Sequence, residues 1–131
     1  KATWHEFKGN KCSEIEKAPV NGTYPVEDVM ILKKVKGNIG LIIKGYFNAP
    51  QDDIYTFALL SDDGSTLTID SEQIVDNDGP HGPKEIVGQK ALAKGYHPME
   101  LRYFDQNGGQ LKLKVTGSDG KEIPFTHLYA H

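Results

Sequence analysis

Residues 54–70 read IYTFALLSDDGSTLTID and contain two alternating segments around one turn. Successive side chains of a β-strand point to opposite faces, so each segment places its apolar residues on one side. Between the two segments, SDDGS supplies Asp and Gly, whose backbone hydrogen bonds and positive φ angles suit tight hairpins. The stretch therefore predicts a hairpin with one buried face. The residues predicted to lie on that face are Tyr55, Phe57, Leu59, Leu67 and Ile69.

The same period of two continues along the chain. DVMILKK (28–34) and GLIIKGYF (40–47) have partly continuous apolar residues, as in strands that are buried on both faces. MELRYF (99–104) and QLKLKV (110–115) alternate like half-buried antiparallel strands, with Phe104 as an outward-facing exception. Only GQKALAKG (88–95) predicts a helix, of one or two turns. About ten short strands predict an all-β fold, either a closed barrel or, as our first choice, an antiparallel β-sandwich of two packed sheets.

The domain organisation is simple. A length of 131 residues suits one core, and we see no repeat or linker, so residues 1–131 are predicted to form a single domain. The least regular segment is NKCSEIEKAPVNGTYPVED (10–28), where Pro19 and Pro25 resist pairing in a central strand. We expect this segment to wrap the edge of the sandwich. Because the sequence begins at Lys1 without an initiator Met, we expect a processed chain or a domain excised from a larger one.

Charge and composition argue against several classes of partner. The chain has 15 Lys and Arg against 18 Asp and Glu, with no run of like charges, which argues against nucleic acid and anionic membrane surfaces as partners. No apolar run approaches the roughly 20 residues of a membrane-spanning helix. Cys12 is the only cysteine, so an internal disulfide and a multi-thiolate zinc site are excluded.

No motif for catalysis stands out. The chain has no G-x-S-x-G turn and no phosphate-binding glycine loop, and the histidines are scattered. The aspartates around SDDGS and DNDG allow two interpretations: they stabilise turns, or their oxygens hold a cation or a sugar. An EF-hand is excluded, because aligning Gly79 with its obligatory glycine puts Ile74 at the first ligand position.

Longer motifs resemble a known family. GYFNAPQDDIYTFALLSDDGSTLTIDSEQIVDNDGPHG (45–82) is followed by LAKGYHPMELRYFDQNGGQLKLKV (92–115). Together they resemble the carbohydrate-associated β-domain named from the anthrax protective antigen, in the form found at the C-terminus of bacterial β-N-acetylhexosaminidases of glycoside hydrolase family twenty. The resemblance implies a β-sandwich that accompanies glycosidases, toxins and yeast adhesins.

The resemblance also implies site residues. In the yeast flocculin branch, two consecutive aspartates joined by a cis peptide and a later asparagine hold calcium, which orients sugar hydroxyls. The matching aspartates are Asp62 and Asp63, and the asparagine position falls on Asp105 or Asn107. We therefore expect a metal site at Asp62, Asp63 and Asp105, and sugar contacts at Asp62, Asp63, Asn107 and His81. The loop FDQNGGQ lacks the aromatic residue with which adhesins hold a sugar. His81 alternatively stabilises the turn in GPHGP.

Three functions are compatible with these observations to different degrees. The first is a non-catalytic, glycan-binding accessory module of a secreted glycoside hydrolase, with the catalytic domain in the same chain. The second is a structural accessory that packs on the catalytic domain or shapes its entrance without binding sugar. An independent enzyme is disfavoured, since glycosidases need two carboxylates opposed across a sugar ring. We expect an exported chain, periplasmic or on the bacterial cell surface, and a monomeric isolated domain.

Overall fold

The computed structural model describes residues 2–24, 38–106, 109–123 and 128–130. Apart from one short 3-10 helix, the regular elements of these residues are strands. None of the described helices is long and apolar enough to cross a membrane. In chain order the elements are β1 (Ala2–Glu6), η1 (Cys12–Lys17), β2 (Val20–Tyr24), β3 (Ile39–Ala49), β4 (Asp53–Asp62), β5 (Ser65–Ile69), β6 (Glu72–Asn77), β7 (Lys84–Leu92), β8 (Gly95–Asp105), β9 (Gln110–Thr116), β10 (Glu122–Ile123) and β11 (Leu128–Ala130).

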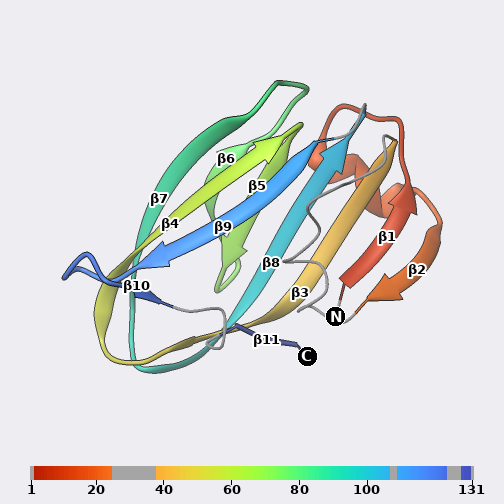
Figure 1. Ribbon diagram of the computed structural model, residues 1–131. Coiled ribbons are helices and arrows are strands. Elements are labelled where there is room, and N and C mark those ends of the chain that lie inside the picture. Colours follow the sequence, from red (N-terminus) through yellow and green to blue (C-terminus); the bar gives the residue numbers. More distant parts are fainter. Residues whose placement is uncertain (1, 25–37, 107–108, 124–127, 131) are drawn as a thin grey trace.

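The strands form two antiparallel sheets that pack face to face (Figure 1). The larger sheet has the order β2-β1-β3-β8-β5-β6, with β11 also paired to β3. The smaller sheet has the order β10-β9-β4-β7. The fold is therefore the predicted all-β sandwich, and the alternative of a closed barrel is not what forms. The ends of β4 and β8 lie at the same end of the sandwich, the upper end in Figure 1.

The space between the sheets holds the core that the alternation predicted. The predicted buried residues on either side of SDDGS, which are Tyr55, Phe57, Leu59, Leu67 and Ile69, are all fully buried. The predicted hairpin is wrong, however: β4 belongs to the smaller sheet and β5 to the larger one, so the turn crosses between the sheets, and both strands still point their apolar sides into the space between them. β8 and β9 contribute the predicted apolar positions Met99, Leu101, Tyr103, Leu111, Leu113 and Val115. Apolar surface removed from water stabilises the fold by roughly 25 cal/mol per Å², so this layer holds the two sheets together.

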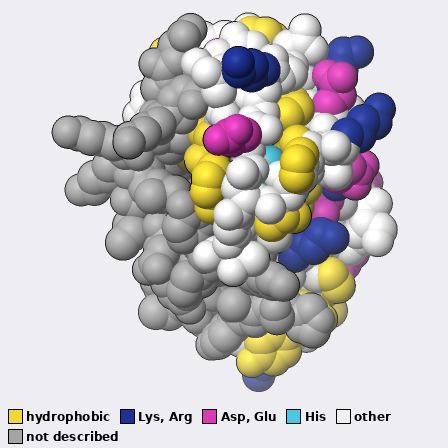
Figure 2. All heavy atoms as spheres, turned by 90° about the vertical axis from the view of Figure 1, so that its right-hand side faces the viewer, with side chains coloured by type: hydrophobic (Ala, Val, Ile, Leu, Met, Phe, Trp, Pro, Cys, Tyr) yellow, Lys and Arg dark blue, Asp and Glu magenta, His cyan; other side chains and the backbone are white. Residues whose placement is uncertain are grey.

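A second, smaller cluster covers the opposite face of the larger sheet. Phe104 was expected to face outward, and its side chain does leave the main core, but it is fully buried. The N-terminal segment covers it: Phe7 meets Phe104 edge to face at 5.8 Å, and Cys12 and Ile15 of η1 complete the cluster with Ile42. The segment around residues 10–24 is therefore more than a loose connection, because it supplies a cover (η1) and an edge strand (β2). Figure 2 looks onto this side and shows hydrophobic side chains near its middle with charged ones around them.

The predicted helix is wrong as well. GQKALAKG was expected to form a helical turn, but residues 88–92 belong to β7, and β8 begins at Gly95. β7 pairs with β4 along its whole length, from Lys84 opposite Ser61 to Leu92 opposite Asp53. These ladder hydrogen bonds outweigh the helix propensity of Ala, Lys and Gln, which is a weak preference. The predicted strand DVMILKK lies outside the described residues.

Candidate metal and carbohydrate site

Three carboxylates meet at the end of the sandwich where β4 and β8 finish. One oxygen each from Asp62, Asp63 and Asp105 lies within 4.8 Å of the other two. Asp62 is the last residue of β4, Asp63 follows it in the turn to β5, and Asp105 is the last residue of β8. The peptide bond between Asp62 and Asp63 is cis, as the family resemblance implied. The structure thus brings together the three residues that the sequence proposed as metal ligands.

Asp63 ties this turn to two other loops. Its Oδ1 accepts a hydrogen bond from the backbone N–H of His81 at 3.1 Å, and its Oδ2 accepts one from the backbone N–H of Gln106 at 2.8 Å. The first contact reaches the loop between β6 and β7, and the second reaches the loop after β8. Each carboxylate oxygen keeps a further lone pair, since a carboxylate offers about four acceptor positions. Asp63 can therefore hold the loops and still contribute to a cation site.

The backbone around the cluster is closely fitted. The Tyr103 hydroxyl donates to the carbonyl oxygen of Asp62 at 2.6 Å. A Cβ atom on Gly109 would lie 2.0 Å from that carbonyl oxygen and 2.9 Å from Oδ1 of Asp105. Only glycine lets the start of β9 approach the carboxylates this closely.

The electrostatics follow from the crowding of like charges. Burial, and then the neighbouring charge of Asp63, raise the pKa of the Asp62 carboxyl above its usual value, while His81 opposes this in part. Burial and the three aspartates also raise the pKa of Tyr103, which keeps its hydroxyl protonated as a donor. Among the described residues, neither Asp62 nor Asp63 forms an ion pair with Lys or Arg.

This arrangement fits a calcium ion. Ca²⁺ binds oxygen ligands at about 2.3 to 2.6 Å, so two ligands of one ion lie at most about 5 Å apart. The spacing within 4.8 Å meets that limit. Like-charged carboxylates that are partly buried favour a cation between them. The glycine that leaves room beside Asp62 and Asp105 is consistent with the same site.

Of the other two predicted site residues, the structure describes His81 but not Asn107. Both ring nitrogens of His81 lie near backbone carbonyls, Nδ1 at 2.7 Å from Gly82 O and Nε2 at 2.8 Å from Asn77 O. The side chain of His81 thus stabilises its own loop, which is the turn-stabilising alternative to a sugar contact. Asn107 lies outside the described residues.

Sequence reasoning missed the groups that position the cluster. These are the Tyr103 hydroxyl, Gly109 and the backbone amides of His81 and Gln106. The glycine pair in DQNGG was a visible signal for a close approach of the backbone. The amides carry no sequence signal, because every residue except proline has one.

The described fold resembles several solved structures. A PA14 sugar-binding domain from an RTX adhesin matches with 22% identity and a TM-score of 0.63, over 76% of this chain and 55% of that one. An anti-sigma factor domain-containing protein from Clostridium clariflavum matches with 22% identity and a TM-score of 0.66, over 73% of this chain and 34% of that one. The Epithelial Adhesin 6 A domain from Candida glabrata, in complex with Galb1-3GlcNAc, matches with 11% identity and a TM-score of 0.66, over 98% of this chain and 84% of that one.

At these identities the likeness concerns the fold. The chain spans about half the length of the RTX adhesin structure and about a third of the length of the Clostridium structure. No curated protein sequence is similar enough to count as a match. The sequence model of one family, the PA14 domain, matches residues 2–125, nearly the whole chain. The chain therefore belongs to the PA14 domain family.

Proposed function

We propose that this chain is a non-catalytic carbohydrate-binding module whose sugar site is built on calcium held by Asp62, Asp63 and Asp105. The observation that carries the proposal is the gathering of these three carboxylates within 4.8 Å at one end of the sandwich. Two structurally similar proteins support the ligand class, since one is a PA14 sugar-binding domain and another is in complex with the disaccharide Galb1-3GlcNAc.

The chain's own residues divide the work at such a site. Bound calcium would supply positive charge and free coordination positions for neighbouring sugar hydroxyls. Asp63 and Asp105 are buried, whereas Asp62 is partly exposed, so a sugar would approach from the side of Asp62. His81 shapes the rim of the same loop cluster, and Asn107 is proposed as a further ligand or sugar contact.

The wider context is proposed from the motif resemblance given above. The module would accompany the catalytic domain of an exported glycoside hydrolase, a β-N-acetylhexosaminidase, in the same chain. Its role would then be to hold the enzyme near glycan. Calcium outside the cell is abundant enough for weak extracellular sites, whose Kd values are about 10⁻⁴ to 10⁻³ M.

One observation favours a second candidate, a structural accessory that binds no sugar. Asp63 already joins three loops through protein amides alone. A carboxylate with that role is useful without any metal, because hydrogen bonds to charged groups contribute about 1.5 to 3 kcal/mol. In this case the aspartates would be turn residues, and the module would pack on its neighbouring domain.

A binding experiment distinguishes the two candidate functions. We would measure the chain against a glycan array that includes N-acetylglucosamine and galactose oligomers, with calcium and with EDTA. Sugar binding that requires calcium and is lost in Asp62→Ala supports the first candidate. Asp62→Ala is suitable because the Asp62 side chain has no described hydrogen bond that the variant would lose. Asp119→Ala, in the β9–β10 loop, is the matched control. Absence of calcium-dependent binding across the array supports the structural accessory.

A further inference from the structure

A shallow depression lies on the outer face of the larger sheet, away from the carboxylates. It has a volume of about 290 Å³, near the lower limit of ligand pockets, which is roughly 300 Å³. Its lining comes from β3, β8 and the end of β5, including Tyr46, Pro98, Thr68 and Glu100. Asp105 is at the other end of β8 from Pro98, roughly 24 Å away at about 3.4 Å per residue.

One aromatic ring lines this depression, and a second lies next to the first. Tyr46 lines it, and the ring of Tyr96 stands perpendicular to that of Tyr46 with the centroids 6.4 Å apart. Tyr96 is 62% exposed, the most exposed of the large hydrophobic side chains described. Tyrosine offers a flat apolar face with a polar end, and both rings here are on the same side of the sheet. The C–H face of a pyranose ring is the kind of surface that stacks on such a face.

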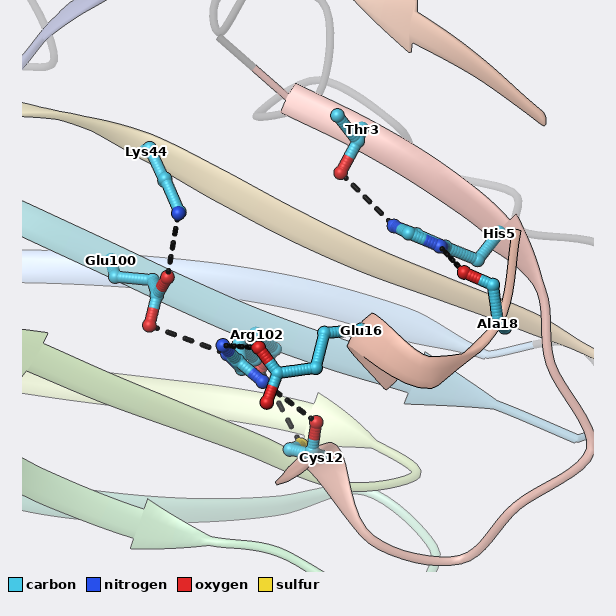
Figure 3. A network of polar contacts seen from close by, with 8 residues as sticks. All are labelled: Thr3, His5, Cys12, Glu16, Ala18, Lys44, Glu100 and Arg102. Carbon is cyan, nitrogen blue, oxygen red and sulfur yellow. Dashed lines mark hydrogen bonds and ion pairs between the residues drawn. The ribbon is translucent and has the colours of Figure 1, made fainter. Parts of the chain in front are cut away.

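Polar groups beside the rings are held in place. Glu100 is bracketed by Lys44 Nζ at 3.7 Å and by Arg102 Nε at 3.3 Å. Arg102 is fixed in turn by Glu16 and by the carbonyl oxygen of Cys12, so the row Lys44–Glu100–Arg102–Glu16 is continuous (Figure 3). A carboxylate fixed in this way is an acceptor that loses little freedom when a ligand binds.

The hydrogen-bonding groups suit sugar hydroxyls. Lys44 has a 68% exposed side chain and can donate, the remaining lone pairs of the Glu100 carboxylate can accept, and the Thr68 and Ser71 hydroxyls can do either. Lys44 and Glu100 carry opposite charges, so the site has no net charge that would select a phosphate or a carboxylate. Its apolar part is too small for a lipid chain. A neutral pyranose matches both the rings and the polar row.

We propose that the depression at Tyr46, Tyr96, Lys44 and Glu100 is a second carbohydrate subsite, selective for a neutral pyranose and independent of calcium. It shares only the class of ligand with the proposed function. Two sites roughly 24 Å apart on one module would contact a polysaccharide at two points. Such paired contacts raise the overall affinity without any new contact at either site.

Amide NMR spectroscopy tests this subsite separately from the calcium site. The ¹⁵N-labelled chain is titrated with chitotriose and with cellotriose, in one series with calcium and in the decisive series with EDTA. We expect saturable shifts at the amides of Lys44, Tyr46 and Glu100, and none at Asp62 and Asp105. Shifts that appear only with calcium, and only around Asp62 and Asp105, would refute the second subsite and support the proposed function. Absence of saturable shifts at Lys44, Tyr46 and Glu100 with both sugars also refutes it.

Variants of the exposed ring provide the second measurement. Tyr96→Ala should weaken the EDTA-resistant binding by about two- to tenfold, the range expected for an aromatic stacking contact. Tyr96→Phe keeps the ring and should retain most of the affinity. Ile54→Ala, which truncates a 53% exposed side chain on the other sheet, is the control and should bind like the parent. Equal affinity of Tyr96→Ala and the parent, with equal melting temperatures, overturns the proposal.

Discussion

The carboxylate of Asp63 and the backbone amide of Gln106 lie 2.8 Å apart, and this contact joins the β4–β5 turn to the loop after β8. A second hydrogen bond, from the amide of His81, joins the same carboxylate to the β6–β7 loop. A single side chain therefore aligns three loops at the end of the sandwich that carries the candidate calcium site. Its contribution can be separated from that of a metal.

Replacing Asp63 should destabilise the chain even without calcium. Asp63→Ala leaves two partly buried amides without their charged acceptor, so we expect a loss of about 1 to 3 kcal/mol in the free energy of unfolding. Urea unfolding in EDTA measures this loss. Lys112→Ala, on the exposed side of β9, should stay within about 0.5 kcal/mol of the parent. If Asp63→Ala matches the parent in EDTA, the loops are held by other contacts.

Gly109 should be required for calcium binding. In Gly109→Ala the new Cβ would meet the Asp62 carbonyl oxygen at 2.0 Å, so β9 or the aspartate turn must move. We expect at least a tenfold weaker calcium affinity, about 1.4 kcal/mol. Calorimetric titration with calcium measures the affinity directly. In the parent, calcium at a hundredfold excess over Kd should raise stability by about 2.7 kcal/mol.

Gly82 offers a matched control for this substitution. A Cβ on Gly82 would meet nothing within 4 Å, and its backbone is outside the left-handed region. Gly82→Ala should therefore bind calcium like the parent and change stability by no more than about 1 kcal/mol. Equal calcium affinities of Gly109→Ala and Gly82→Ala would show that the close approach of β9 is irrelevant to the site.

The metal-free chain should show a pH dependence that belongs to Asp62. The folded-state pKa of Asp62 is raised by burial and by Asp63, so its contribution to stability is complete at low pH. That contribution is lost as the pH rises from about 3.9, the usual value for Asp, through the raised pKa. An asparagine at position 62 does not ionise, so Asp62→Asn should lack this part of the decline in unfolding free energy.

Urea unfolding in EDTA between pH 3 and 7 provides the comparison. The difference in unfolding free energy, Asp62→Asn minus parent, should increase across this interval. The calcium affinity of the parent should fall at acid pH, because carboxylate ligands must be deprotonated to bind the ion. A difference that stays constant with pH would mean that Asp62 is not perturbed by its neighbours.

Cys12 should be unreactive in the native state. It is the first residue of η1 and only 1% exposed, and burial, followed by the charge of Asp78, raises the pKa of its thiol. Because the thiolate is the reactive species, modification by a disulfide reagent should be slow until the segment opens. Phe7→Ala, which removes part of the cover beside Phe104, should accelerate the reaction. A thiol that reacts equally fast with and without urea would contradict the packing of η1.

Much of the fold could be read from local patterns. Alternation in IYTFALL, TLTID and QLKLKV identified buried positions because the pleat of a strand sends alternate residues to one face. Local patterns gave the wrong prediction where a segment distant in sequence packs against the residues concerned. Phe104 has the outward phase, but η1 and Phe7, from the far end of the chain, bury it. GQKALAKG has a helical composition, but β4 offers it a complete ladder of backbone hydrogen bonds.

The sequence by itself determined the all-β class, the buried face of the strands on either side of SDDGS and the candidacy of Asp62, Asp63 and Asp105, but not that these two strands belong to different sheets. Only the tertiary structure decided that these carboxylates share one small space, and that Gln106, His81, Tyr103 and Gly109 surround them. It also decided that Tyr46 and Tyr96 stand together on the outer face. The physical reason is that side-chain direction follows from local backbone geometry, whereas the meeting of loops depends on how strands distant in sequence pair and pack.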